Sequence, residues 1–221
     1  MAVTARRASC LARPALFVCA SWMAVAGWAE PDATFRDLRY MGTVAQTTEY
    51  SCGAAAVATL LSLYFGVESS EDVVLSLAEE QIRARGEEPA TESGLTAYDL
   101  KEASGSLGLR LAGYELGMEE LEGYFANGGF PVVAHVEDPR SHYIVVVGIA
   151  EEHLLLCDPG WGRYIAPIGE LRDARGMSGV FLIALPTEEQ AEHARRRQAE
   201  AVGWMVCRLS QLRDLRENLA P

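Results

Sequence analysis

Lysine is nearly absent from the sequence. It occurs once, at Lys101, and the 19 Lys and Arg residues are outnumbered by 31 Asp and Glu residues, which gives a formal net charge of −12 at pH 7. A nucleic-acid-binding protein needs a basic surface that neutralises phosphates, so this balance argues against nucleic acid as a partner. An acidic surface instead keeps a protein soluble or, as the alternative, attracts basic substrates.

The sequence also lacks the pattern of a disulfide framework or a metal site. Of its five cysteines, Cys10 and Cys19 fall in an N-terminal segment that we expect to be removed, which leaves Cys52, Cys157 and Cys207. An odd number of thiols does not suit a disulfide framework. No His, Cys and acidic residues have metal-ligand spacing, so we expect no metal or other cofactor. The sequence shows no internal repeat.

Residues 1–29 have the features of a secretory signal peptide. An apolar stretch over residues 15–29 is preceded by three arginines, Arg6, Arg7 and Arg13. This order of a basic region and an apolar region is typical of export signals. The competing interpretation is an uncleaved membrane anchor, for which the apolar stretch is short. We therefore expect a periplasmic protein with no transmembrane segment after cleavage and a net charge of about −15.

The stretch around Cys52 carries the strongest signal for chemistry. Residues 54–65 are rich in Ala and Leu and end at Gly66, which predicts a buried helix. Ser51 suits the N-cap of this helix and places Cys52 in the first turn. Unpaired backbone N–H groups and the helix dipole favour a thiolate there. The alternative is a small buried cysteine that only packs.

A thiolate nucleophile needs a histidine base and a group that orients the base. His142 opens the strand-like run 142–148, and Asp158 ends the next such run, 154–158. Two neighbouring antiparallel strands bring the start of one beside the end of the other, so we expect His142 and Asp158 to be adjacent. Gln46, shortly before Cys52, is a candidate donor to an oxyanion.

These residues resemble those of the C39 peptidases, papain-like enzymes that remove double-glycine leaders from bacteriocins. The resemblance covers roughly residues 38–185 and rests on Gln46, Cys52-Gly53-Ala54-Ala55, His142-Tyr143 and Asp158-Pro159. It implies that Cys52 is the nucleophile, His142 the base, Asp158 its orienting group and Gln46 the oxyanion donor. It also implies a narrow groove that admits small residues, notably glycine, before the cut. Transporter-fused members often have Asp where this chain has Ser51, and we expect this chain to act without an attached ABC transporter.

The order of the expected elements, helices first and strands later, predicts an α+β fold, which agrees with the papain-like fold of the family. We expect a C39-like peptidase domain over residues 30–186. The helices are expected at about 54–65, 69–85, 95–104 and 118–126, and the strands at about 109–114, 131–136, 143–149, 154–157 and 180–185.

Residues 187–221 are predicted to form an amphipathic helical tail. Large apolar residues recur there at steps of three and four, namely Val202, Met205, Val206, Leu209, Leu212, Leu215 and Leu219. Such a stripe either folds back on its own domain or forms a docking or self-association helix for an export partner or a membrane surface.

Two glycine-containing motifs have open interpretations. Trp161, between Gly160 and Gly162, either walls the substrate groove or packs on the sheet. The pair Gly128-Gly129 resembles a double-glycine cleavage site, but it directly precedes a predicted core strand, so we interpret it as a loop.

The sequence therefore predicts an exported cysteine peptidase that cuts after small residues in a secreted protein or peptide. One alternative is a non-catalytic C39-like binding module that assists export or assembly of a secreted, amyloid-like substrate. Another is a different Cys–His chemistry, such as that of a cell-wall amidase or a transglutaminase. Stand-alone exported C39-like peptidases are also encoded with functional-amyloid export systems, and this chain resembles that arrangement. A secretion or amyloid-export component is thus the expected partner class.

Overall fold

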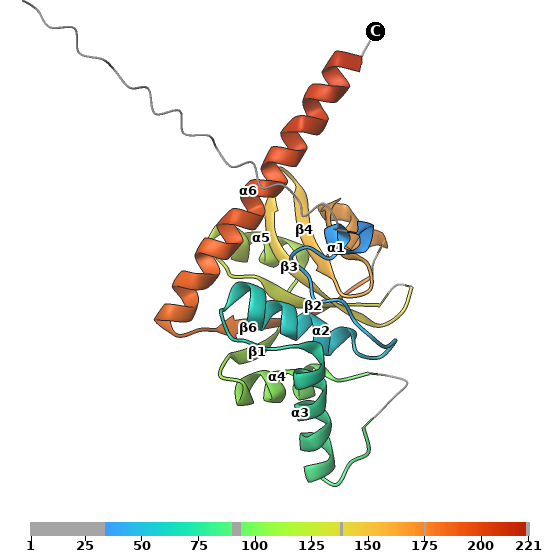
Figure 1. Ribbon diagram of the computed structural model, residues 1–221. Coiled ribbons are helices and arrows are strands. Elements are labelled where there is room, and N and C mark those ends of the chain that lie inside the picture. Colours follow the sequence, from blue (N-terminus) through green and yellow to red (C-terminus); the bar gives the residue numbers. More distant parts are fainter. Residues whose placement is uncertain (1–33, 90–93, 138, 175, 220–221) are drawn as a thin grey trace, which may run out of the picture. The chain divides into compact units, whose positions relative to one another are not determined.

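A six-stranded antiparallel sheet organises the chain, as the computed structural model in Figure 1 shows. The structure describes residues 34–89, 94–137, 139–174 and 176–219, so the expected signal peptide lies outside the described residues. The strand order is β1-β6-β2-β3-β4-β5. The strands are β1 (Arg110–Glu115), β2 (Val132–Val136), β3 (His142–Ala150), β4 (His153–Asp158), β5 (Gly162–Pro167) and β6 (Met177–Leu185).

Both faces of the central strands are buried, which explains their nearly continuous apolar sequences. Val133 and Val145 point into one apolar cluster, whereas Val132 and Ile144 point into another on the opposite face. This alternation is the period of two that a strand imposes. Helices α2 (Cys52–Thr59), α3 (Glu71–Ala84), α4 (Ala97–Ser106) and α6 (Glu188–Leu219) contribute to the first cluster, and α5 (Met118–Ala126) contributes to the second. The predicted α+β fold is confirmed.

The helix that follows Cys52 is not regular to its end. After Thr59 it continues as a π-helical turn, η1 (Leu60–Tyr64), in which the Phe65 N–H donates to the Leu60 carbonyl at 3.1 Å. Gly66 then ends the helix with φ of +69°, a backbone conformation that glycine adopts without strain. Side-chain patterns do not distinguish a π turn from an α turn, so the sequence predicted one continuous helix.

Two elements were missed by the sequence-based prediction. The short helix α1 (Phe35–Arg39), capped by Thr34 and Asp37, was not among the predicted elements. Strand β5, which pairs with β4, was also missed, because its Gly and Pro ends read as turns. A second π-helical turn, η2 (Glu170–Ala174), follows it.

Helix α6 belongs to the domain over most of its length. Ala194 and Met205 are fully buried, and the Gln198 side chain donates to the carbonyls of Val147 and Gly129 at 2.8 and 3.0 Å. Beyond Met205 the apolar side chains are more exposed, reaching 56% at Leu212 and 57% at Leu215. Figure 1 shows this end of α6 in red, extending past the strands. Within the described ranges, no helix combines the length and the apolar character that a membrane span requires.

Candidate active site

Cys52 is the first residue of α2 and is only 7% exposed. Ser51 occupies the N-cap position as expected, but the expected side-chain cap is wrong. The Ser51 hydroxyl instead accepts from the Thr48 N–H at 3.1 Å and donates to the Thr48 carbonyl at 3.0 Å. A serine side chain bonds readily to backbone groups a few residues away, and here the preceding loop provides both partners. The amides of the first helical turn therefore do not receive this cap, and they lie beside the thiol.

The loop before Cys52 is tied to two other parts of the site. The Gln46 N–H donates to the Pro159 carbonyl at 2.9 Å, which connects the loop to the turn after Asp158. The Thr47 N–H donates to Oε1 of Glu71 at 2.7 Å. Glu71 opens α3 and is only 4% exposed. Acidic residues are common in a first helical turn, so the position of Glu71 in the sequence gives no sign of this contact.

His142 and Asp158 are neighbours, as the strand pairing predicted. The ring nitrogen Nε2 of His142 lies 2.8 Å from Oδ1 of Asp158. The Gly160 N–H donates to the same oxygen at 2.9 Å, and the Asp158 side chain is buried. In the antiparallel pair of β3 and β4, Val145 lies opposite Cys157, which brings the start of β3 near the end of β4. The carboxylate thereby fixes the orientation of the ring.

Cys52 and His142 each shift the pKa of the other. Burial alone would raise the pKa of the Cys52 thiol, but the hydrogen bond and charge of His142, with the N–H groups of Tyr143 and Gly53, outweigh burial and lower it. Burial also disfavours a charged His142 ring, yet hydrogen bonds to Asp158 and Cys52 raise the pKa of His142 to about 9. Both shifts favour a thiolate beside an imidazolium. Because Nε2 bonds to Asp158, the other ring nitrogen, Nδ1, is the one that bonds to the Cys52 thiol.

Gln46 lies in the same site. It lines a hollow of about 420 Å³ together with His142 and Asp158. Its amide nitrogen Nε2 donates to the Thr48 carbonyl at 2.8 Å, and this nitrogen carries a second N–H. The four residues that the sequence singled out are therefore brought together at one end of α2.

The other cysteine and histidine residues lie apart from this arrangement. Cys157 is fully buried, and burial raises the pKa of its thiol, as suits a packing residue. His135 bonds through Nε2 to the Ser141 hydroxyl at 2.8 Å and lies against the Tyr143 ring, 4.9 Å between centroids. The described residues include no cluster of three or more His, Cys, Asp or Glu side chains suited to hold a metal ion.

Three further residues line the hollow. Sequence patterns did not mark Glu49 and Arg140 as site residues, and they left the role of Trp161 open. Trp161 lines it and is 62% exposed, so the groove interpretation of this residue agrees with the structure. Glu49 and Arg140 form an ion pair at 3.2 Å along its lining. Both are exposed loop residues, and no local pattern marks such residues as partners.

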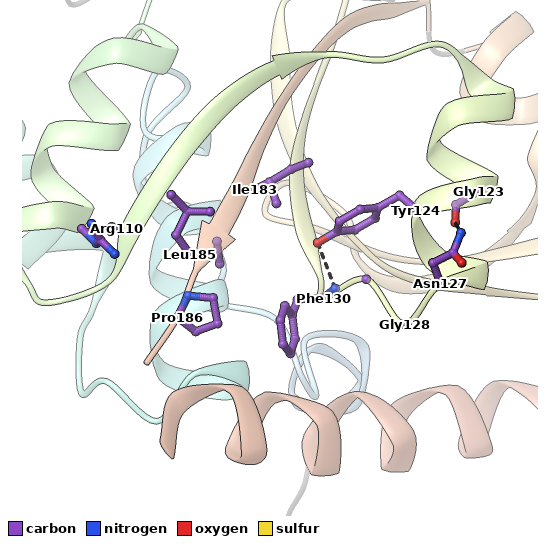
Figure 2. A pocket seen from close by; sticks show the side chains of 11 residues that line it. Arg110, Gly123, Tyr124, Asn127, Gly128, Phe130, Ile183, Leu185 and Pro186 are labelled. Carbon is purple, nitrogen blue, oxygen red and sulfur yellow. Dashed lines mark hydrogen bonds between the residues drawn. The ribbon is translucent and has the colours of Figure 1, made fainter. Parts of the chain in front are cut away.

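A larger hollow, of about 670 Å³, lies where β2 begins and β6 ends, at the opposite end of β2 and β3 from His142. Figure 2 shows Tyr124, Phe130 and Ile183 around it, with the Tyr124 hydroxyl accepting from the Phe130 N–H at 2.9 Å. Gly128 lines it in a turn with φ of +80°, so the Gly128-Gly129 pair forms a loop. None of the four candidate catalytic residues lines this hollow.

Comparison with known families gives a match to the model of the Peptidase C39 family over residues 41–188. The chain belongs to the Peptidase C39 family. The matched region contains all four candidate residues and ends where α6 begins. The predicted family is thus confirmed, and the chain is a member of a family of proteases.

Individual relatives agree with this assignment. A probable functional amyloid protease FapD from Pseudomonas aeruginosa is 27% identical over 153 residues, which cover 69% of this chain and 64% of that protein. The corresponding protein of Pseudomonas fluorescens is 28% identical over 59% of this chain and 55% of its own length. The chain therefore spans less than two thirds of the length of these relatives.

Solved structures show the same fold. A double glycine motif protease from an AMS/PCAT transporter, crystallised with its leader peptide, aligns with a TM-score of 0.53 and 25% identity over 66% of this chain and 91% of that one. The peptidase domain of Streptococcus ComA, a bifunctional ABC transporter involved in quorum sensing, aligns with a TM-score of 0.54 and 21% identity over 66% of this chain and 98% of its own. The papain-like fold of C39 peptidase domains is therefore the fold of this chain.

Proposed function

We propose that this chain is an exported cysteine endopeptidase that cuts a peptide bond after small residues in a secreted protein or peptide. The observation that carries the proposal is the connected set of Cys52, His142 and Asp158 at the start of a buried helix, with the pKa values of thiol and imidazole shifted in opposite directions. That arrangement supplies a nucleophile, a proton donor and an orienting carboxylate.

The reaction follows from these positions. The Cys52 thiolate attacks the carbonyl carbon of the scissile bond, and the developing oxyanion receives hydrogen bonds from the Gln46 amide and the first-turn N–H of α2. Protonated His142 then gives its proton to the leaving amine, and the C–N bond breaks to leave a thioester on Cys52. A water molecule attacks the thioester while His142 takes up its proton. The acid product leaves, and the thiolate–imidazolium pair is restored.

A preference for small residues before the cut agrees with the confined position of the thiol. Cys52 is only 7% exposed, so little open space surrounds the reacting sulfur. The similarity to a double glycine motif protease supports Gly-Gly or Gly-Ala as the expected residues.

The biological setting that we propose is a secreted amyloid system. It rests on the similarity to two proteins described as probable functional amyloid proteases and on the expected signal peptide. The substrate or partner would then be a component of amyloid export. The Asp and Glu excess of the chain agrees with a protein that works on such components rather than on nucleic acid.

A peptide library that varies the residue before the cut tests the proposed activity. We expect cleavage after Gly-Gly and Gly-Ala, poor cleavage after bulky residues, and no turnover by Cys52→Ala. Cys207→Ala, which removes the exposed thiol on α6, is the matched control and should behave as the wild type. A profile dominated by Leu, Arg or Phe would contradict the specificity, and full turnover by Cys52→Ala would contradict the mechanism.

A further inference from the structure

The hollow beside the candidate catalytic residues lies on the His142 side of the site. Its described lining includes His142, Asp158 and Trp161, but it does not include Cys52. The hollow therefore opens on the proton donor His142 and on Gln46 rather than on the thiol. At about 420 Å³, it has room for one or two residues of a peptide.

The chemistry of the proposed reaction indicates which part of the substrate lies on the His142 side. His142 must reach the amine that leaves, so the leaving part of the substrate lies on the His142 side of Cys52. The residues after the scissile bond are attached to that amine and continue from it. Resting on the proposed function, we infer that this hollow binds the first one or two residues after the cut, and that Trp161 selects an apolar or aromatic side chain among them.

Trp161 is held ready for such a contact. The Arg39 guanidinium lies 3.9 Å from the centre of its ring, and Arg39 Nε donates to the Trp161 carbonyl. The turn itself is fixed, because the Trp161 N–H donates to the Asp158 carbonyl at 3.1 Å and the Tyr40 hydroxyl donates to the Gly160 carbonyl at 2.9 Å. With 62% of its surface exposed, Trp161 presents a large apolar area whose ordering on binding costs little entropy.

The remaining wall favours selection by shape over selection by charge. Glu49 and Arg140 line the hollow and form an ion pair at 3.2 Å, so their charges compensate each other. Their side chains are 88% and 77% exposed, and a pair so open to solvent creates only a weak local field. Stacking on the indole is therefore the main source of discrimination.

Two kinds of substrate with the same Gly-Gly acyl part separate this subsite from the rest of the enzyme. One is a peptidyl methyl ester, whose methanol leaving group is too small to fill the hollow. The others are quenched fluorescent peptides with Phe, Leu, Gly, Glu or Lys in the first and second positions after the cut. The quantity compared is the ratio of kcat/KM for each peptide to kcat/KM for the ester of the same variant.

We expect the wild-type ratio to be about 10-fold higher with Phe or Leu than with Gly. Trp161→Ala should remove this difference, whereas Trp161→Phe, which keeps a flat apolar ring, should retain most of it. Tyr114→Ala is the matched control, because Tyr114 is an exposed aromatic residue on β1, at the other edge of the sheet from the β4–β5 turn. It should leave every ratio unchanged.

The outcomes are distinguishable. Three outcomes would each overturn the inference alone. The enzyme could hydrolyse the ester but cut all the peptides equally well, or it could prefer Glu or Lys over Phe and Leu after the cut. In the third outcome, the preference for Phe survives in Trp161→Ala. Failure of the wild type to hydrolyse both the ester and the peptides would overturn the proposed function, and this inference with it.

Discussion

At the scale of single residues, the position of one proton governs the proposed reaction. The thiolate–imidazolium pair exists between the lowered pKa of Cys52 and the pKa of His142, about 9. Below this window the thiol is protonated and cannot attack, and above it the ring has lost the proton that the leaving amine needs. Activity should therefore rise as Cys52 ionises and fall as His142 deprotonates.

The first prediction concerns pH. We expect kcat/KM to have an upper limb near pH 9 and a lower limb below the ordinary thiol pKa of 9.0, measured on a Gly-Gly peptide.

Iodoacetamide near neutral pH should alkylate Cys52 well before exposed Cys207, while buried Cys157 stays unlabelled. Mass mapping that finds Cys207 labelled and Cys52 inert would contradict an activated thiol.

The second prediction concerns Asp158. Asn at this position keeps an oxygen that accepts from His142 and Gly160 but removes the negative charge that raises the pKa of His142. Asp158→Asn should fold, lose activity by about 10²–10⁴-fold in kcat and show its upper pH limb at lower pH. Asp214→Asn, at an exposed residue of α6, is a control for loss of one carboxylate. An unshifted upper limb would show that Asp158 does not set the ionisation of His142.

The four residues of the candidate site stood out in the sequence because their signals are local. A cysteine before an apolar helix, a histidine that opens one strand and an aspartate that ends the next are all visible in sequence order. The Ser51 side chain was predicted wrongly, because two partners compete for its hydroxyl and only the loop conformation decides between them. Contacts such as Glu49 with Arg140 join loops 91 residues apart, and their side chains carry no pattern.

At the scale of elements, the loop before Cys52 depends on α3. Glu71 receives the Thr47 N–H at 2.7 Å, so the first residue of α3 holds the loop that carries Gln46. Glu71→Ala should reduce kcat and lower the free energy of unfolding by about 1–3 kcal/mol, because a hydrogen bond to a buried carboxylate is lost. Glu71→Gln keeps an acceptor oxygen and should retain more activity. Equal activity and equal urea midpoints for all three proteins would exclude this positioning role.

Helix α6 should divide into two parts by stability. A chain that ends at Pro186 loses Met205, and the burial of one large apolar side chain contributes about 1.5–3 kcal/mol to stability. It also loses the hydrogen bonds of the Gln198 side chain. We expect it to aggregate or melt at a much lower temperature. A chain that ends at Leu209 keeps these contacts and should retain its Tm and its peptide cleavage. A Pro186 truncation with unchanged Tm would show that α6 is dispensable for folding and would favour docking for the whole helix.

Element prediction succeeded where the apolar pattern was clear and failed where it was weak. Helix α5 was predicted with its observed ends, Met118 and Ala126, because its apolar face and capping glycine agree. The five-residue helix α1 is too short for a helical period to emerge, and strand β5 has Gly and Pro at its ends, which read as turns. The tail helix was visible as a stripe, but the sequence did not show which part of the stripe is covered.

At the scale of the whole molecule, the proposed setting outside the cytoplasm can be tested on the chain itself. Cleavage after Ala29 should remove three arginines and change the net charge from −12 to about −15. Expressed in a Gram-negative host, the protein should appear in the periplasmic fraction with an intact mass that begins at Glu30. Replacing Arg6 and Arg7 by Glu should reduce export, whereas Glu30→Gln should not. Cytoplasmic protein with an intact N-terminus would contradict the signal-peptide assignment.

The two members of the acid–base pair belong to different layers of the fold. Cys52 comes from the helical layer and His142 from the sheet, so neither layer alone contains both members of the pair. The thiol therefore acquires its unusual acidity only after the two layers have docked, and a chain that is still folding carries an ordinary, slowly reacting cysteine. Assembly of the tertiary structure is thus the activation step of the proposed peptidase. The rate of Cys52 alkylation, followed by mass mapping, therefore reports when the two layers dock during refolding.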